Sequence, residues 1–185
     1  MNHAPDIDLV HRLRNGDVAA GGLLYERYKR KIYTFVRAMV RDDAAAEDIL
    51  QQTFLAMIEK IGTVKDPSMF RSWLYSIARN EAMMLLRRRK IVPMDPLEEA
   101  DDVVDPSTPL LMTEGIQTSD LIRTALLRLR PLYREAFLLR ERDGMSYDEI
   151  VAVTGASLTA VKSRLFQARL ALNTQLTPFL DEGAL

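Results

Sequence analysis

The chain has 185 residues, almost half of them hydrophobic, which is enough for one domain or two small ones with compact cores. It has no cysteine and two histidines, which excludes disulfides, thiolate metal sites and a cysteine nucleophile and disfavours histidine-based metal or acid–base chemistry. No apolar run reaches the roughly 18 residues of a membrane span, and the N-terminus lacks a signal-peptide layout. We therefore expect a cytoplasmic protein without membrane insertion, metal or cofactor.

Charge is distributed unevenly along the chain, although the net charge is only −1. Residues 1–92 carry 16 Lys and Arg against 11 Asp and Glu, and residues 119–185 carry nine against eight. Between them, residues 93–118 contain seven acidic residues, four prolines and no basic residue, without helical periodicity. This composition is typical of a flexible linker and predicts two parts joined by an acidic connector.

Four stretches of the first part have apolar residues at helical spacing and predict helices. They span about 6–15, 18–40, 43–61 and 69–90, with Gly16, Asp42-Asp43 and the loop 62–68 between them. The fourth stretch ends in four consecutive cations, Arg87 to Lys90. Cations stabilise the C-terminal end of a helix dipole, but a run of four also suits an anionic polymer.

The helix over 43–61 has a buried stripe and a distinct outer side. Its predicted buried residues are Leu50, Phe54, Met57 and Ile61. The outer side carries Asp48, Gln51, Gln52 and Leu55. An apolar residue with a polar rim is either plain surface or the centre of a protein-binding patch, and the pattern alone favours plain surface.

The second part predicts four short helices, the last two forming a helix-turn-helix over 145–172. Ser146 and Glu149 form a capping box, Gly155 ends that helix, and Ser157 or Thr159 caps the next. The last helix buries Val161, Leu165, Ala168 and Leu172, with a frayed or docking tail after Thr177. Its other sides carry Thr159, Lys162, Ser163, Arg164, Phe166 and Gln167, side chains that suit a DNA major groove. A soluble hairpin with a solvated basic face is the alternative. The expected fold class is all-α, with two small helical domains.

Three stretches together resemble the extracytoplasmic-function (ECF) group of bacterial sigma factors, over about residues 7–175. AEDILQQTFLAMIEKI (46–61) is similar to the family's core-binding helix. FRSWLYSIARNEAMMLLRRRK (70–90) is similar to its promoter-melting and minus-ten-reading helix, and 145–172 to its minus-35-reading helix-turn-helix. The resemblance implies that residues 1–92 form a region-two domain and 119–185 a region-four domain. The linker resembles the segment that the family threads into the RNA exit path.

The resemblance also implies roles for residues already singled out. RNA polymerase core, through its beta-prime clamp helices and beta flap, and promoter DNA become the expected partners, with an anti-sigma factor on a separate chain. The expected clamp-binding residues are Asp48, Gln51, Gln52 and Leu55. Minus-ten DNA is expected to be bound by Lys65, Ser68, Arg71, Arg79, Asn80, Arg87 and Arg88, with the loop 62–68 enclosing a flipped base. Minus-35 DNA is expected at Thr159, Lys162, Ser163, Arg164, Phe166 and Gln167.

Three positions depart from the family pattern. Gln52 stands where Glu is usual, Met84 where Asp is frequent, and Gln167 where Arg is usual, so the contacts at these points are expected to differ. Two other functions compete with a non-enzymatic initiation factor. An autonomous helix-turn-helix regulator would need paired half-sites or a phosphoacceptor domain. An enzyme would need a nucleophile–base pair or a phosphate loop, for which the sequence offers no motif.

Overall fold

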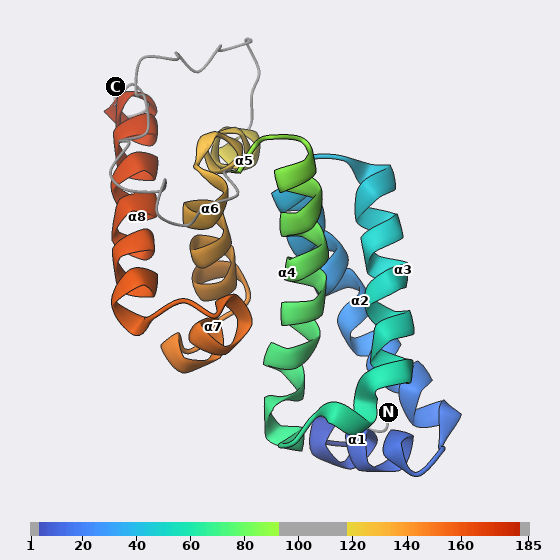
Figure 1. The fold of residues 1–185 in the computed structure, drawn as a ribbon. Coiled ribbons are helices and arrows are strands. Elements are labelled where there is room, and N and C mark those ends of the chain that lie inside the picture. Colours follow the sequence, from blue (N-terminus) through green and yellow to red (C-terminus); the bar gives the residue numbers. More distant parts are fainter. Residues whose placement is uncertain (1–3, 93–117, 182–185) are drawn as a thin grey trace.

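The structure of the chain is a computed structural model that describes residues 4–92 and 118–181. Every regular element in these residues is helical, as predicted, and they contain no strand (Figure 1). The first group comprises α1 (Asp6–Arg14), α2 (Val18–Val40), α3 (Asp43–Lys60) and α4 (Phe70–Arg88), with the short 3-10 turns η1 (Ile61–Thr63) and η2 (Pro67–Met69) before α4. The second comprises α5 (Thr118–Arg128), α6 (Pro131–Phe137), the π-turn η4 (Leu138–Arg142), α7 (Tyr147–Thr154) and α8 (Leu158–Asp181).

The predicted linker, apart from Thr118, lies outside the described residues. So do the last four residues of the chain. Among the described elements, no helix is both long and apolar enough to cross a lipid bilayer.

Local signals set the helix boundaries where they were expected. Asp17 and Asp42 each accept hydrogen bonds from backbone N–H groups in the first turn of α2 and α3. The Ser146–Glu149 capping box is present at α7, and Gly155 ends α7 in the left-handed conformation (φ 69°). Ser157, rather than Thr159, caps α8 by accepting from Ala160 N. The tail expected after Thr177 is instead the last turn of α8, which continues to Asp181.

The second group packs as the sequence predicts. The stripe of Val161, Leu165, Ala168 and Leu172 on α8 is buried against α5, α6 and α7. This packing holds α8 by one side only and leaves its other sides available.

The burial of α4 is wider than its periodicity predicts. The helical spacing of its apolar residues predicts a buried stripe of Phe70, Trp73, Leu74, Ile77 and Leu85. Phe70 and Leu74 are buried, but the other three are only half-buried. Five apolar residues outside the predicted stripe are also buried: Tyr75, Ala78, Ala82, Met83 and Leu86. The physical reason is that α4 packs against α2 and α3 on one side and against α7 on another. One buried apolar cluster therefore runs from the first group into the second.

Candidate nucleic-acid and protein interfaces

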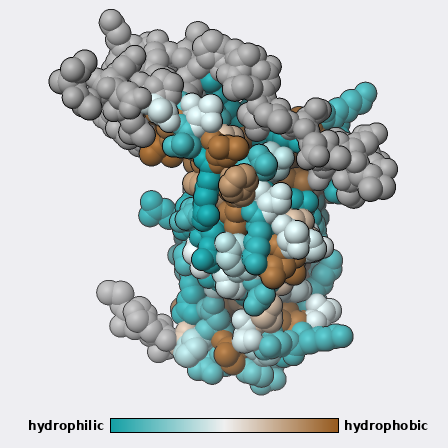
Figure 2. Space-filling model, turned by 90° about the vertical axis from the view of Figure 1, so that its left-hand side faces the viewer, coloured by the Kyte–Doolittle hydropathy of each residue, from teal (hydrophilic) through white to brown (hydrophobic). Residues whose placement is uncertain are grey.

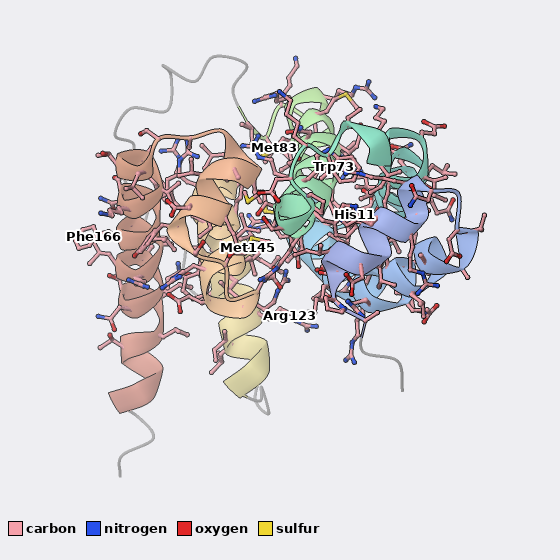
Figure 3. The ribbon with its side chains drawn as sticks, turned by 90° about the horizontal axis from the view of Figure 1, so that it is seen from below. His11, Trp73, Met83, Arg123, Met145 and Phe166 are labelled. Carbon is pink, nitrogen blue, oxygen red and sulfur yellow. The ribbon has the colours of Figure 1, made fainter. Side chains whose placement is uncertain are left out.

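The exposed side of α8 carries the residues expected to read duplex DNA. Thr159, Lys162 and Ser163 are exposed, and 64% of the Phe166 side chain is exposed. Phe166 projects outward from α8, away from the rest of the molecule (Figure 3). Arg164 and Gln167 are half-buried on the flanks of the same helix. The structure thus brings the six residues onto one helix whose opposite stripe is fixed in a core.

Cations surround the turn that presents α8. The Lys162 Nζ atom lies 5.9 Å from the centroid of the Tyr147 ring, and the Arg140 guanidinium carbon lies 4.9 Å from it. Viewed from the side of α8, hydrophilic and hydrophobic residues are interspersed over the coloured part of the surface (Figure 2). A surface of this kind suits contacts with both phosphates and base edges.

The outer side of α3 holds the residues expected to bind a protein. Asp48, Gln51 and Gln52 are exposed, and Leu55 is 60% exposed. Ile58, one turn further, is 58% exposed, so the apolar part of this surface is larger than expected. The three-residue spacing from Leu55 to Ile58 could have indicated it. Burial of Ile49, Phe54 and Met57 on the opposite side fixes the orientation of the patch.

The loop before α4 is fixed by its own side chains. Asp66 accepts hydrogen bonds from the N–H of Ser68 (2.9 Å) and from its hydroxyl (2.7 Å). These two bonds lower the pKa of the Asp66 carboxyl below its usual value. Val64 is buried beneath the loop, while Lys65 and Ser68 are exposed. Because these bonds fix the loop, it loses little conformational entropy when a ligand binds.

The remaining residues expected at minus-ten DNA fall into two sets. Asn80, Arg87 and Arg88 are exposed. Arg71 and Arg79 instead contact the second group of helices. Their roles as phosphate contacts remain predictions, and in this arrangement those contacts require the second group to move.

Arg79 and Glu135 form an enclosed ion pair between the two groups. The Arg79 Nε atom lies 2.7 Å from Oε1 of Glu135, and Nη2 lies 3.4 Å from Oε2. The Glu135 side chain is fully buried, and only 13% of the Arg79 side chain is exposed. The bidentate geometry is the one in which a guanidinium also binds phosphate.

Arg134 is a buried structural residue that the sequence did not reveal. It is buried and donates to four backbone carbonyls: Ala38 and Met39 near the end of α2, and Leu127 and Leu129 at the end of α5. Burial, together with the nearby Arg41, lowers the pKa of its guanidinium to about 9. It remains charged at neutral pH and stabilises the carbonyl ends of two helices, one from each group.

The described residues contain no cluster of three His, Asp or Glu side chains that could hold a metal ion. The residues predicted to bind partners lie on three surfaces: α3, the loop with α4, and α8.

Two family models match the chain. Sigma-70 region 2 matches residues 24–91, and Sigma-70 region 4 matches residues 119–172. The first match contains the α3 surface and the loop with α4, and the second contains α8.

Relatives match over almost the whole chain. The RNA polymerase sigma-H factor of Pseudomonas aeruginosa is 32% identical over 99% of this chain and all of its own. The ECF RNA polymerase sigma-E factor of Escherichia coli is 31% identical over 93% of this chain and 94% of its own.

Solved structures match as well. CnrH in complex with the cytosolic domain of CnrY has a TM-score of 0.69 at 25% identity, covering 94% of this chain and 97% of that one. The sigma factor RpoE of Bartonella quintana, solved with the anti-sigma factor NepR, has a TM-score of 0.64 at 25% identity. The match covers 84% of this chain and 96% of that one.

Proposed function

Since the chain belongs to the ECF group of the sigma-70 family, we propose that it is a transcription initiation factor, which binds RNA polymerase core and directs it to specific promoters. The observation that carries this function is the presence of both family regions in one chain, in the order found in relatives that match from end to end. Its action requires no catalytic residue, and we place it in the cytoplasm, where polymerase and promoter DNA meet.

Each of the three surfaces is proposed to bind a different partner. Residues 1–92 bind the polymerase clamp through α3 and the melted minus-ten DNA through the loop and α4. Residues 119–185 bind the duplex minus-35 element through α8, and 93–118 connect the two. The exposed Leu55 and Ile58, rimmed by Asp48, Gln51 and Gln52, have the composition of a protein contact with an apolar centre.

On α8, phosphate contacts position the helix and base contacts select the sequence. Lys162 can bind a phosphate or an acceptor atom of guanine. Ser163 can bind either a donor or an acceptor group on a base edge, and Phe166 can contact the methyl group of thymine. On α4, Asn80 can pair with a base edge, while the loop encloses an unstacked base and offsets part of its unstacking energy.

The partners are RNA polymerase core, promoter DNA and an anti-sigma factor on another chain. The anti-sigma factor is proposed because RpoE of Bartonella quintana, a structural relative, was solved with one. An autonomous helix-turn-helix regulator is not favoured, because the first family region accounts for the other half of the chain.

A run-off transcription assay tests the function. Core polymerase with the purified chain is expected to initiate from a subset of a genomic promoter library, and core polymerase alone is not. Absence of stimulated initiation at every promoter overturns the proposal. Tight binding to a palindromic duplex without polymerase would support the autonomous regulator instead.

A further inference from the structure

Helix α1 lies beside the loop that connects α3 to α4 (Figure 1). It contacts both short turns of this connection, η1 and η2. Leu9, Val10 and Leu13 of α1 are buried in the same apolar cluster as Ile61 and Val64. The loop therefore rests on α1 as well as on the two helices that it connects.

Arg14, the last residue of α1, forms a hydrogen bond with the end of α3. Its Nε atom donates to the carbonyl oxygen of Ile61 at 3.3 Å, across 47 residues of sequence. The same oxygen accepts from the N–H of Val64, also at 3.3 Å, which closes the first turn of the loop. Arg14 thus holds the acceptor around which this turn is built.

The end of α3 explains why a cation is favourable at this point. The last carbonyls of a helix have no partner within the helix and carry the negative end of its dipole. No glycine or left-handed residue caps α3, because Ile61 stays in the right-handed region (φ −56°) and the chain tightens into η1. Arg14 supplies from α1 the basic C-terminal cap that α3 lacks in its own sequence.

Stability alone does not account for a guanidinium in this place. Arg14 is half-buried, and its Nη2 atom is enclosed without an acceptor among the described residues. An enclosed donor without a partner is unfavourable for folding. Residues that depart from the rules of stability in this way tend to lie at functional sites.

We propose that Arg14 is a positioning residue for the capture of the minus-ten base, because it holds the first turn of the loop in place. The inference rests on the proposed function, in which the loop encloses an unstacked base. Arg14 acts through the backbone of Ile61 and Val64 and does not itself touch the base. Asp66 fixes the other end of the loop through its two bonds from Ser68, so the loop is held at both ends.

A loop held at both ends is ordered before DNA arrives, so it loses less conformational entropy when it encloses a base. If the first turn is released, only a fraction of molecules presents a formed loop. The apparent affinity for the captured base then falls in proportion to that fraction. The predicted minus-35 contacts lie on α8, and recognition of that element should not change.

Two variants and one control separate the bond of Arg14 from its position on α1. Arg14→Ala removes the cation and its donor. Arg14→Lys keeps a cation and a donor for the Ile61 carbonyl, and it should restore most of the function. The control, Arg12→Ala, makes the same change two residues earlier, where the side chain pairs with Asp17.

Amide hydrogen exchange of the full chain measures the hold on the loop without DNA or polymerase. We expect Arg14→Ala to speed exchange of the Val64 N–H about three- to tenfold, Arg14→Lys to speed it less, and Arg12→Ala to match wild type. A general loss of stability would instead speed exchange of the slowest amides in the helices, including those of α8.

Initiation with core polymerase measures base capture. A promoter selected in the run-off assay is changed one base at a time in its minus-ten and minus-35 elements. For each protein, the ratio of initiation from the original and the changed promoter gives the discrimination at that base. Arg14→Ala should reduce discrimination at the captured minus-ten base about three- to tenfold and leave that at minus-35 bases unchanged.

Equal exchange of the Val64 N–H in wild type and Arg14→Ala would overturn the hold of Arg14 on the loop. Faster exchange with unchanged minus-ten discrimination would overturn its role in base capture. A failure of the proposed function has a different result. In that case Arg14→Ala still speeds exchange, but wild type initiates at no promoter, so the hold on the loop stands and the initiation function is wrong.

Discussion

The guanidinium of Arg134 donates a 3.1 Å hydrogen bond to the carbonyl oxygen of Met39, 95 residues earlier in the chain. The same side chain donates to Leu129, 2.8 Å away, at the end of α5. One buried cation therefore terminates a helix in each half of the protein. Its hydrogen-bond acceptors among the described residues are four backbone carbonyls, whose dipoles compensate its charge.

Arg134→Gln is expected to lower the free energy of unfolding by about 2–4 kcal/mol, because it leaves buried carbonyls without a donor. The measurement is urea unfolding followed by circular dichroism. Arg88→Gln, at an exposed position of α4, serves as the control and should change the stability by less than about 0.5 kcal/mol. Equal stability of the two variants would show that Arg134 is not a structural cap.

Asp48→Arg is expected to abolish binding to polymerase core while the melting temperature stays close to that of wild type, because Asp48 is exposed. Co-purification with core polymerase measures the loss. Glu26→Arg makes the same charge reversal at an exposed site on α2 and should retain binding. Retention of polymerase by Asp48→Arg would remove this residue from the interface.

Phe166→Ala is expected to weaken initiation from promoters with thymine in the minus-35 element about 5- to 50-fold, because an apolar contact with a thymine methyl is lost. Replacing thymine by uracil removes only that methyl. The losses of initiation caused by Phe166→Ala and by uracil should not add, because both changes remove the same contact. Leu170→Ala, on the same exposed side of α8, is the control. Additive losses would argue against a contact between Phe166 and the methyl group.

Asp66 predicts a pH dependence of the loop before α4. The hydrogen bonds from Ser68 lower the pKa of Asp66 below its usual value of 3.8. A depressed folded-state pKa means that the stabilisation is fully present above this value and is lost as the pH falls through the lower, folded-state pKa. The melting temperature of wild type should therefore exceed that of Asp66→Asn at pH 7. This difference in melting temperature should shrink below about pH 4. A difference that is constant between pH 7 and pH 3 would exclude this contribution.

The elements that could be predicted from the sequence are those with local causes. The capping box at Ser146, the left-handed Gly155 and the buried stripe from Val161 to Leu172 depend on residues only a few positions apart. The exposure of Leu55 followed from the same periodicity. Its role as a polymerase contact came from the resemblance and remains a prediction.

The rest depends on contacts between distant parts of the chain. Tyr75 is buried beside Phe35 of α2, with ring centroids 5.5 Å apart, on a side of α4 that the periodicity of α4 leaves open. Glu135 is fully buried because Arg79, 56 residues earlier, lies opposite it. A charged residue in a short helix is usually exposed, so neither Arg134 nor Glu135 carried a local sign of burial.

The pairing of Arg79 with Glu135 affects how mutational scans of this protein should be interpreted. Arg79 is enclosed with Glu135 of the second group and is also a predicted contact for minus-ten DNA. A loss of promoter activity in an Arg79 variant therefore does not by itself identify which of the two interactions was lost. Comparison with Glu135→Gln, which removes only the charge of the partner, separates the two.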